Sequence, residues 1–527
     1  MKYTSCKKRF ALFLAAILLA GCFSGCDMLP FNKGDATSSS IENENEERTF
    51  TSIYKGRQTV KLATKQTTEI AINQEIGEQN YFKIDLLSDV NLVGYIHYAA
   101  VDKAATTHKE KMYIEQGTSE FTMFLDAFRK GAFGNFAKKI EKITLQNVSG
   151  QEGNVRVTEV SVSNRTYDNQ KTLYINNGKL KLGASLAAGG AICHLEKMDE
   201  NVVEYLDGEG NVRIDKNVDA SKVKVISKEV NLINVHDLGR EIQQSYYAIV
   251  DESHGYAPKD EVLYEGAVLY NPVQAGSAGD KQSQIIDYRC TDTEIYVKIR
   301  PQDWFFDNTQ TDSYMENIYK FGENGVLMVH NRFVNFSQFT DMEKAQISSQ
   351  ETPAVYTVYP LNYFYCETQS GVILDPNLSS MMTSNKKTDL NDPVNEPYYY
   401  MMSQEKVPDD WFAFVNDKNF GVGIYVPNSD FYGASRGWAS TAYDMIHNHS
   451  YNKEFYYVPR GEYVPSAYAV NYNYCSAPVI RRMVDFVPFE YEYAICVGTV
   501  DEMRGNFLCL KEAGTIQNEG LNAWENA

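Results

Sequence analysis

The stretch NLINVHDLGREIQQSYY, residues 231–247, together with LYNPVQAG at 269–276, decides how the rest of the chain is interpreted. The first stretch places His236, Asp237 and Arg240 among only a few aliphatic residues. It is too polar for a plain core strand and too rich in Ile, Val and Tyr for a disordered loop. Fixed polar groups beside aromatic rings are what a concave site for a polar ligand needs. The two stretches therefore predict the lining of a binding site.

Short runs of alternating polar and apolar residues surround this region. The runs at 81–87, 91–98, 111–115 and 154–162 all alternate with period two, which is typical of strands with one buried face. From 172 to 510 strand patterns dominate again, without a sustained helical period. The chain also holds 37 Tyr and 26 Phe but only 15 Pro, which favours a large and well-packed β protein. We therefore predict the all-β class.

The length of the chain predicts at least two domains, because roughly 480 ordered residues exceed what one hydrophobic core holds. We expect a β-sandwich over 51–166 and a larger β domain over 167–511, joined by a short polar junction at 164–171. The residues 512–527 are polar and turn-forming, and we expect them to be a peripheral tail.

The first 22 residues have the pattern of an export signal. Lys7, Lys8 and Arg9 precede an uncharged run over 10–20, which is too short to span a bilayer. The run ends in Leu-Ala-Gly-Cys22, which resembles the bacterial lipobox. That resemblance implies that Cys22 is lipid-modified and becomes the first residue of the mature chain.

The lipobox resemblance implies a protein anchored by lipid to the extracytoplasmic face of the cell membrane. The residues 23–50 are then a tether, because Asn, Ser, Glu and Thr dominate 31–50 and are too polar to bury a core. Cys26 is a second candidate for lipidation, but Phe23 stands where the motif has an aliphatic residue. An ordinary signal peptide that happens to contain a Cys is the alternative.

Charge and motifs exclude several function classes. Without the four cations of the signal, 46 basic residues stand against 69 acidic ones, so nucleic acid is not expected as a partner, whereas a neutral glycan is easily accommodated. The nine Cys form no Cys-x-x-Cys pair, and His447 and His449 have no third ligand at matching spacing, so no metal is predicted. A phosphate-binding loop, a Rossmann fingerprint and a Gly-x-Ser-x-Gly elbow are all absent, and no cofactor is predicted.

Three stretches carry a resemblance to a known family. The Leu-Lys-Leu-Gly at 180–183, the Gly-Gly-Ala-Ile at 189–192 and the segment 231–240 resemble the beginning of galactose-mutarotase-like β-supersandwich domains. The resemblance implies such a fold over about 340 residues and a sugar cleft reached by 231–240. Because the superfamily includes epimerases, hydrolases, lyases and binding-only members, it leaves the reaction open. The pattern of 51–166 resembles jelly-roll carbohydrate-binding modules, with a structural spacer as the alternative.

Acid/base chemistry at a sugar needs one group that takes a proton and another that gives one. Glu316 and Glu351 are the candidate carboxylates, and His236 and His330 are their candidate partners. Two glutamates facing each other across a cleft would indicate a hydrolase, whereas a glutamate facing a histidine would indicate ring opening and mutarotation. Glu316 in a surface ion pair and His330 as an ordinary sheet residue are the alternatives.

The candidate substrate-binding residues are polar or aromatic side chains on the same stretches and on the later strands. They are Asp237, Arg240, Gln243, Tyr246, Asn271, Gln274, Trp304, Tyr314 and Arg332. Arg332 shares a strand face with His330, and a guanidinium suits a carboxylate or a hydroxyl pair. Arg240 tying strands together is the alternative reading of that residue. Trp304, Trp411 and Trp438 are candidate stacking platforms for sugar rings, with packing in the core or at its rim as the alternative.

These observations favour a lipid-anchored extracellular protein that binds and processes a glycan. A non-catalytic surface glycan-binding lipoprotein is the alternative, and a structural envelope protein is a third hypothesis. The first hypothesis requires that Glu316, Glu351, His236 and Arg240 meet at one hollow.

Overall fold

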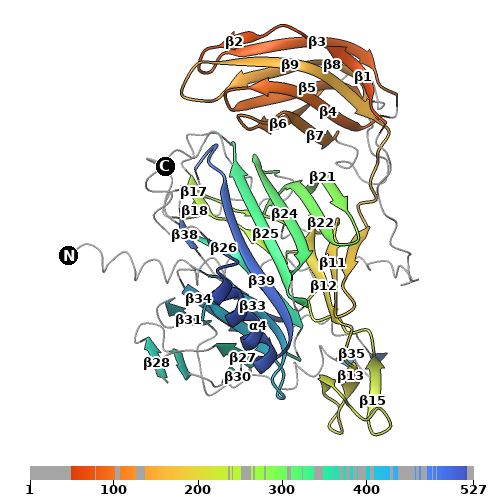
Figure 1. Ribbon diagram of the computed structural model, residues 1–527, viewed down its shortest axis with the longest axis vertical. Coiled ribbons are helices and arrows are strands. Elements are labelled where there is room, and N and C mark those ends of the chain that lie inside the picture. The colour runs from red at the N-terminus through yellow and green to blue at the C-terminus, as the bar shows by residue number, and fades with distance from the viewer. Residues whose placement is uncertain are drawn as a thin grey trace, which may run out of the picture.

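The computed structural model describes residues 49–518 with internal gaps. The gaps are 78, 101–106, 126–136, 236–237, 240, 251–262, 265–266, 278–280, 305–309, 323–324, 338–347, 359, 362, 367–371, 376–379, 384–387, 390–398, 404–408, 428–430, 437–456, 459–461, 464–471, 477–478 and 482–483. Within the described residues, antiparallel strands form every layer and α4 (Val500–Ala513) is the helix (Figure 1). The predicted all-β class is confirmed.

The N-terminal part is a β-sandwich, drawn at the top of Figure 1. One sheet contains β1 (Thr51–Lys55), β9 (Gly153–Ser163), β4 (Tyr81–Ser88) and β7 (Glu120–Phe124), with β2 (Val60–Leu62) beside β9. The other contains β3 (Thr67–Glu75), β8 (Ala137–Asn147), β5 (Leu92–Ala100) and β6 (Thr107–Ile114). The alternating pattern works as predicted, because Ile84, Leu86 and Ile96 are buried between the sheets.

Two large sheets make up most of the remaining chain. The first has nine strands: β21 (Gln284–Cys290), β22 (Glu294–Arg300), β24 (Ser313–Phe321), β25 (Leu327–Asn335), β39 (Phe489–Thr499), β33 (Phe420–Tyr425), β32 (Trp411–Val415), β27 (Tyr363–Cys366) and β30 (Thr388–Asp389). The second has eight: β23 (Gln302–Asp303), β20 (Pro272–Val273), β16 (Gln243–Ser245), β26 (Ser348–Val358), β37 (Tyr472–Ser476), β34 (Phe431–Arg436) and β31 (Tyr399–Ser403), with β38 (Val479–Arg481) beside β26. One hydrophobic core contains residues from both sheets, so they pack face to face.

Smaller sheets flank this pair. They are β10 (Thr172–Asn176), β11 (Leu180–Ser185) and β12 (Ala191–Lys197); β13 (Val202–Leu206), β14 (Val212–Lys216) and β15 (Lys224–Ser227); β17 (Ala248–Val250), β18 (Leu263–Tyr264) and β19 (Ala267–Tyr270); β28 (Val372–Asp375) and β29 (Ser380–Thr383); and β35 (Tyr457–Val458) and β36 (Glu462–Tyr463). The turn before β12 needs its two glycines. Gly189 and Gly190 have φ of 56° and 75°, and a Cβ on Gly189 would lie 2.2 Å from the Gln274 carbonyl oxygen.

Helix α4 lies on the outer face of the nine-stranded sheet, over β33, β32 and β39 (Figure 1). Met503 and Phe507 pack there, and a Cβ on Gly423 would lie 2.7 Å from the Met503 sulfur. This helix was not predicted, and the expected tail at 512–527 begins inside it. Two signals were available: Thr499 and Glu502 form a capping box, and Gly514 ends the helix in the left-handed conformation.

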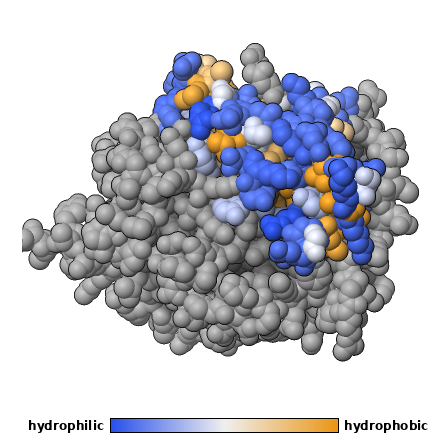
Figure 2. Space-filling view, turned by 90° about the horizontal axis from the view of Figure 1, so that it is seen from below, coloured by the Kyte–Doolittle hydropathy of each residue, from blue (hydrophilic) through white to orange (hydrophobic). Residues whose placement is uncertain are grey.

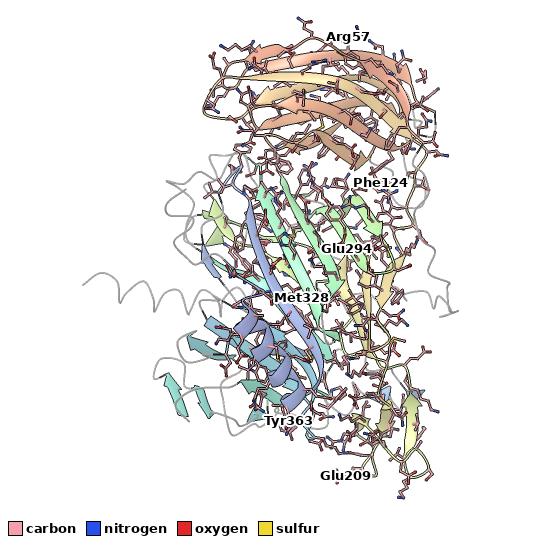
Figure 3. The ribbon with its side chains drawn as sticks, viewed as in Figure 1. Arg57, Phe124, Glu209, Glu294, Met328 and Tyr363 are labelled. Carbon is pink, nitrogen blue, oxygen red and sulfur yellow. The ribbon has the colours of Figure 1, made fainter. Side chains whose placement is uncertain are left out.

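The N-terminal sandwich covers another part of the same outer face. Its core includes Tyr314, Val334 and Phe336 from the nine-stranded sheet, so one core crosses the domain boundary. Phe124 lies on the side of the sandwich that faces the sheet (Figure 3). Arg165, from the predicted polar junction, bonds Asp287 at 2.7 Å and lies 4.6–5.0 Å from the ring centres of Phe124 and two tyrosines.

The surface seen from the end opposite the sandwich is mainly hydrophilic where it is described, with scattered hydrophobic residues (Figure 2). This view agrees with the acidic composition of the chain. Among the described residues, no helix has both the length and the apolar character needed to cross a membrane.

Candidate functional site

Several predicted residues lie outside the part of the chain that the structure describes. They are Cys22, His236, Asp237, Arg240, Trp438, His447 and His449. Their predicted roles stay predictions. In the described ranges, no group of three His, Cys, Asp or Glu residues is arranged to hold a metal ion.

Tyr246 and Gln274 lie in the core between the two large sheets. The Tyr246 hydroxyl donates to Gln244 at 2.8 Å, and its ring stacks on Phe333 with a centroid distance of 3.9 Å. Gln274 accepts from the Gln244 backbone N–H at 3.0 Å and donates to the Gly189 carbonyl at 3.1 Å. The prediction placed both side chains at a ligand site, and the structure instead uses them to join the sheets. Polar groups buried this deeply need protein partners, which they have.

The outer face of the eight-stranded sheet carries Ser245, Tyr247 and Glu351. The side chain of Gln244 points to the inner layer, where it donates to Asn317 at 2.7 Å, so its neighbour Ser245 points outward. The Tyr247 hydroxyl lies within hydrogen-bonding reach of both Ser245 and Glu351. Tyr247 and Glu351 are half-buried, so solvent reaches both. A phenol and a carboxylate, both half-buried, therefore meet on one sheet face.

The surroundings of Tyr247 hold it in the neutral form. Burial, followed by the negative charge of Glu351, raises the pKa of Tyr247 well above 10. Gln350 fixes the backbone at this position, because it accepts from the Tyr247 N–H at 2.7 Å and donates to the Tyr247 carbonyl at 2.9 Å. Sequence reasoning did not select Tyr247 or Ser245 as site residues. Their signal was the alternation of Gln243, Ser245 and Tyr247 along the opening stretch.

Gln243, Asn271 and Trp304 shape the backbone beside this face. Gln243 donates to the Gly239 carbonyl at 2.6 Å and accepts from the Ala275 N–H at 3.1 Å. Asn271 donates to the Tyr246 carbonyl at 2.8 Å. The Trp304 ring lies so close to Gly239 that a Cβ there would be 2.3 Å from it. These three predicted residues are thus near Tyr247 and Glu351 and support the loops around them.

Glu316 and Arg332 lie elsewhere, on the outer face of the nine-stranded sheet. Four charged residues pair in register across four neighbouring strands: Lys298 on β22, Glu316 on β24, Arg332 on β25 and Glu490 on β39. Glu316 lies 3.3 Å from Lys298 and 3.1 Å from Arg332, and accepts from the Tyr296 hydroxyl at 2.9 Å. This is a ladder of opposite charges across four strands.

A cavity of about 320 Å³ opens above this ladder, between the sheet and the N-terminal sandwich. Tyr314, Glu316 and Arg332 line it from below, and Glu115 lines it from the sandwich and bonds Arg332. His330 shares the strand face of Arg332, as predicted, and both reach Glu490. The Nδ1 atom of His330 lies 3.3 Å from Glu492, so this histidine belongs to a surface cluster with the two glutamates.

The described residues do not form the common hollow that the sequence analysis expected. Glu351 lies on the outer face of the eight-stranded sheet and Glu316 on the outer face of the nine-stranded one. Both sheets and their shared core lie between the two carboxylates. The expectation was wrong because each glutamate alternates outward from a different sheet. A two-carboxylate hydrolase site made of Glu316 and Glu351 is therefore not formed.

The pKa of Glu316 predicts how stability depends on pH. Burial alone would raise this pKa, but the charges of Lys298 and Arg332 and the Tyr296 hydrogen bond lower it to about 2. Because the folded state lowers the pKa from its ordinary 4.5, the stabilisation is complete above about pH 4.5 and is lost as the pH falls towards 2. Between pH 5 and pH 2.5, we expect the free energy of unfolding to fall by on the order of 2–3 kcal/mol more in the wild type than in Glu316→Gln.

Urea unfolding of both proteins across this pH range measures the difference. Glu69→Gln is the control, since Glu69 pairs with Lys142 in an exposed position and should follow the wild type. An equal fall in the free energy of unfolding of the wild type and of Glu316→Gln would contradict the prediction.

Comparison with known proteins finds no matching family model and no similar curated protein. Solved structures that resemble the chain include the 4-alpha-glucanotransferase of Thermococcus litoralis, at 10% identity and a TM-score of 0.29 over 63% of this chain. The chain spans 40% of the length of that enzyme. The GalM/aldose epimerase homologue of C. elegans matches at 9% identity and a TM-score of 0.31, over 62% of this chain and 98% of its own. Likenesses at this level carry no argument about activity.

Proposed function

We propose that the protein is a lipid-anchored, extracytoplasmic protein that binds a neutral glycan on the outer face of the eight-stranded sheet and transfers protons at a sugar there. The observation that carries the proposal is the approach of the Tyr247 phenol to the Glu351 carboxylate, both half-buried, on the outer face of the sheet. A hydroxyl and a carboxylate in contact are the two kinds of group that acid/base chemistry at a sugar needs.

The neutral state of Tyr247 sets the roles of the pair. Tyr247 is a neutral phenol at pH 7 because its pKa lies well above 10, so it carries the proton that the pair can donate. Glu351 serves as the proton acceptor, and Ser245 orients the phenol between them. The acidic balance of the chain supports a neutral substrate.

Glu351→Gln and Tyr247→Phe test the proposed chemistry. Each removes one proton-transferring group with little change in volume, so product formation should fall at least about 100-fold. Chromatography of the products from a panel of neutral oligosaccharides measures product formation. Glycan binding is measured on the same panel and should persist in both variants.

Glu69→Gln is the matched control, because this exposed carboxylate pairs with Lys142 on the N-terminal sandwich and should leave turnover intact. Product formation that is unchanged in Glu351→Gln would contradict the proposal. Saturable binding without any product in the wild type would favour the non-catalytic surface glycan-binding lipoprotein instead.

The lipid anchor is a separate part of the proposal and rests on the Leu-Ala-Gly-Cys22 motif. Cys22→Ala should move the protein from the membrane fraction to the soluble fraction when it is expressed in a bacterium, and should abolish labelling by a radioactive fatty acid. Cys26→Ala is the control and should remain with the membrane. Membrane fractionation and labelling that survive Cys22→Ala would show that Cys22 is not the anchor.

A further inference from the structure

The cavity between the N-terminal sandwich and the nine-stranded sheet is separate from the proposed site at Glu351. Its volume of about 320 Å³ is at the lower end of the range typical of small-ligand pockets, about 300–1,000 Å³. Both domains line it: Tyr113, Thr118 and Phe121 come from the sandwich, and Tyr296 and Tyr314 come from the sheet. The boundary between two domains is a common position for a ligand site.

The charges that line the cavity balance one another. Lys298 and Arg332 flank Glu316, and Arg332 also bonds Glu115 and Glu490. An anionic ligand would have to compete with these carboxylates for the same cations. A neutral ligand with many hydroxyl groups can instead donate to the carboxylates and accept from the ammonium and guanidinium groups without disturbing the pairs.

Aromatic rings contribute the apolar part of the lining. Phe121 and Tyr314 lie under the Lys298 ammonium group, with ring centres 5.5 and 4.7 Å from it, and Tyr296 lies under Arg289 at 4.6 Å. Cations therefore cover these rings, so the lining offers a ligand mainly polar groups, which suit the hydroxyls at the edge of a pyranose.

One hydroxyl group in the lining has unused hydrogen-bonding capacity. Tyr113 is 3% exposed, and its hydroxyl has no hydrogen-bond partner among the described residues. The ring is held in place by stacking on Phe336, with centroids 5.5 Å apart. A buried hydroxyl without a partner is costly, so a ligand that bonds to it would recover free energy.

We propose that this cavity binds one neutral pyranose residue, with Tyr113 bonding a sugar hydroxyl and the Glu316–Arg332–Lys298 group bonding others. The choice of a sugar rests on the proposed function, but the site does not depend on catalysis at Glu351. Because both domains contact the ligand, binding also stabilises the contact between them.

Saturation-transfer NMR titrations of the full chain with glucose, galactose, mannose, maltose and cellobiose test the inference. Tyr113→Phe removes only the partnerless hydroxyl, so the fold should be unaffected while sugar binding weakens about 3- to 10-fold. Thr118→Trp should weaken it more than 10-fold by filling the cavity. Thr67→Trp, on the exposed part of β3, is the matched control and should bind as the wild type does.

The outcomes separate this site from the proposed one. Binding that is weakened in both cavity variants and kept in Thr67→Trp supports the cavity. Binding that is unchanged in Tyr113→Phe and Thr118→Trp overturns it, and loss of product formation in Glu351→Gln then leaves the proposed function standing without the cavity. The absence of binding to all five sugars also overturns the assignment.

Discussion

Arg300→Ala is expected to destabilise the protein by about 3–5 kcal/mol, because it removes the cation of a buried ion pair between the two domains. Arg300 is 7% exposed and lies 3.5 Å from Glu110 of β6, whose side chain is fully buried. Its guanidinium also bonds Asp312 and donates to the Thr311 carbonyl at 2.9 Å. Without Arg300, the Glu110 carboxylate remains buried but loses the positive charge of the guanidinium. The free-energy cost of its desolvation is then no longer offset.

Urea unfolding followed by circular dichroism measures this loss. Lys61→Ala is the control, because Lys61 and Glu152 form an exposed pair that should contribute no more than about 1 kcal/mol. Adding Glu110→Gln to Arg300→Ala should recover part of the loss, since it removes the buried charge. A loss below about 1 kcal/mol in Arg300→Ala would show that the pair does not stabilise the domain contact.

Trp411→Ala is expected to lower the free energy of unfolding by about 3–5 kcal/mol, because it leaves a cavity in the core. Trp411 is fully buried beneath α4, with ring centroids 5.3 Å from Tyr365 and 5.6 Å from Phe507. Of the two readings of this tryptophan, the structure shows core packing and not a sugar platform. Glycan binding by Trp411→Ala should therefore remain normal at temperatures where the variant is folded.

Thermal unfolding and glycan titration together check this prediction. Trp411→Phe is the matched variant: it keeps most of the ring packing and removes an indole N–H that has no partner among the described residues, so it should cost clearly less than the alanine change. Selective loss of glycan binding in a folded Trp411→Ala protein would contradict the core role.

Periodicity predicted the strands well because it is a local property. The runs at 81–87 and 154–162 are strands β4 and β9, and His330 and Arg332 share a face as their spacing requires. The helix α4 was missed because its amphipathic pattern is short and polar, although Thr499, Glu502 and Gly514 marked both of its ends.

The candidate site was predicted only in part. The opening stretch does place residues on the outer face of the eight-stranded sheet, since Ser245 and Tyr247 lie there with Glu351. The same stretch also supplies Gln244 and Tyr246 to the core, because alternate side chains of one strand serve opposite faces. Polarity alone did not separate the two sets.

The sequence by itself determined the all-β class and the alternation of faces along each strand, because these depend on neighbouring residues. Only the tertiary structure decided which sheet each strand joins, and hence that Glu316 faces the N-terminal sandwich while Glu351 faces away from it. Strand pairing joins residues far apart in the chain, and a period of two fixes which side chains share a face but not which partner that face meets.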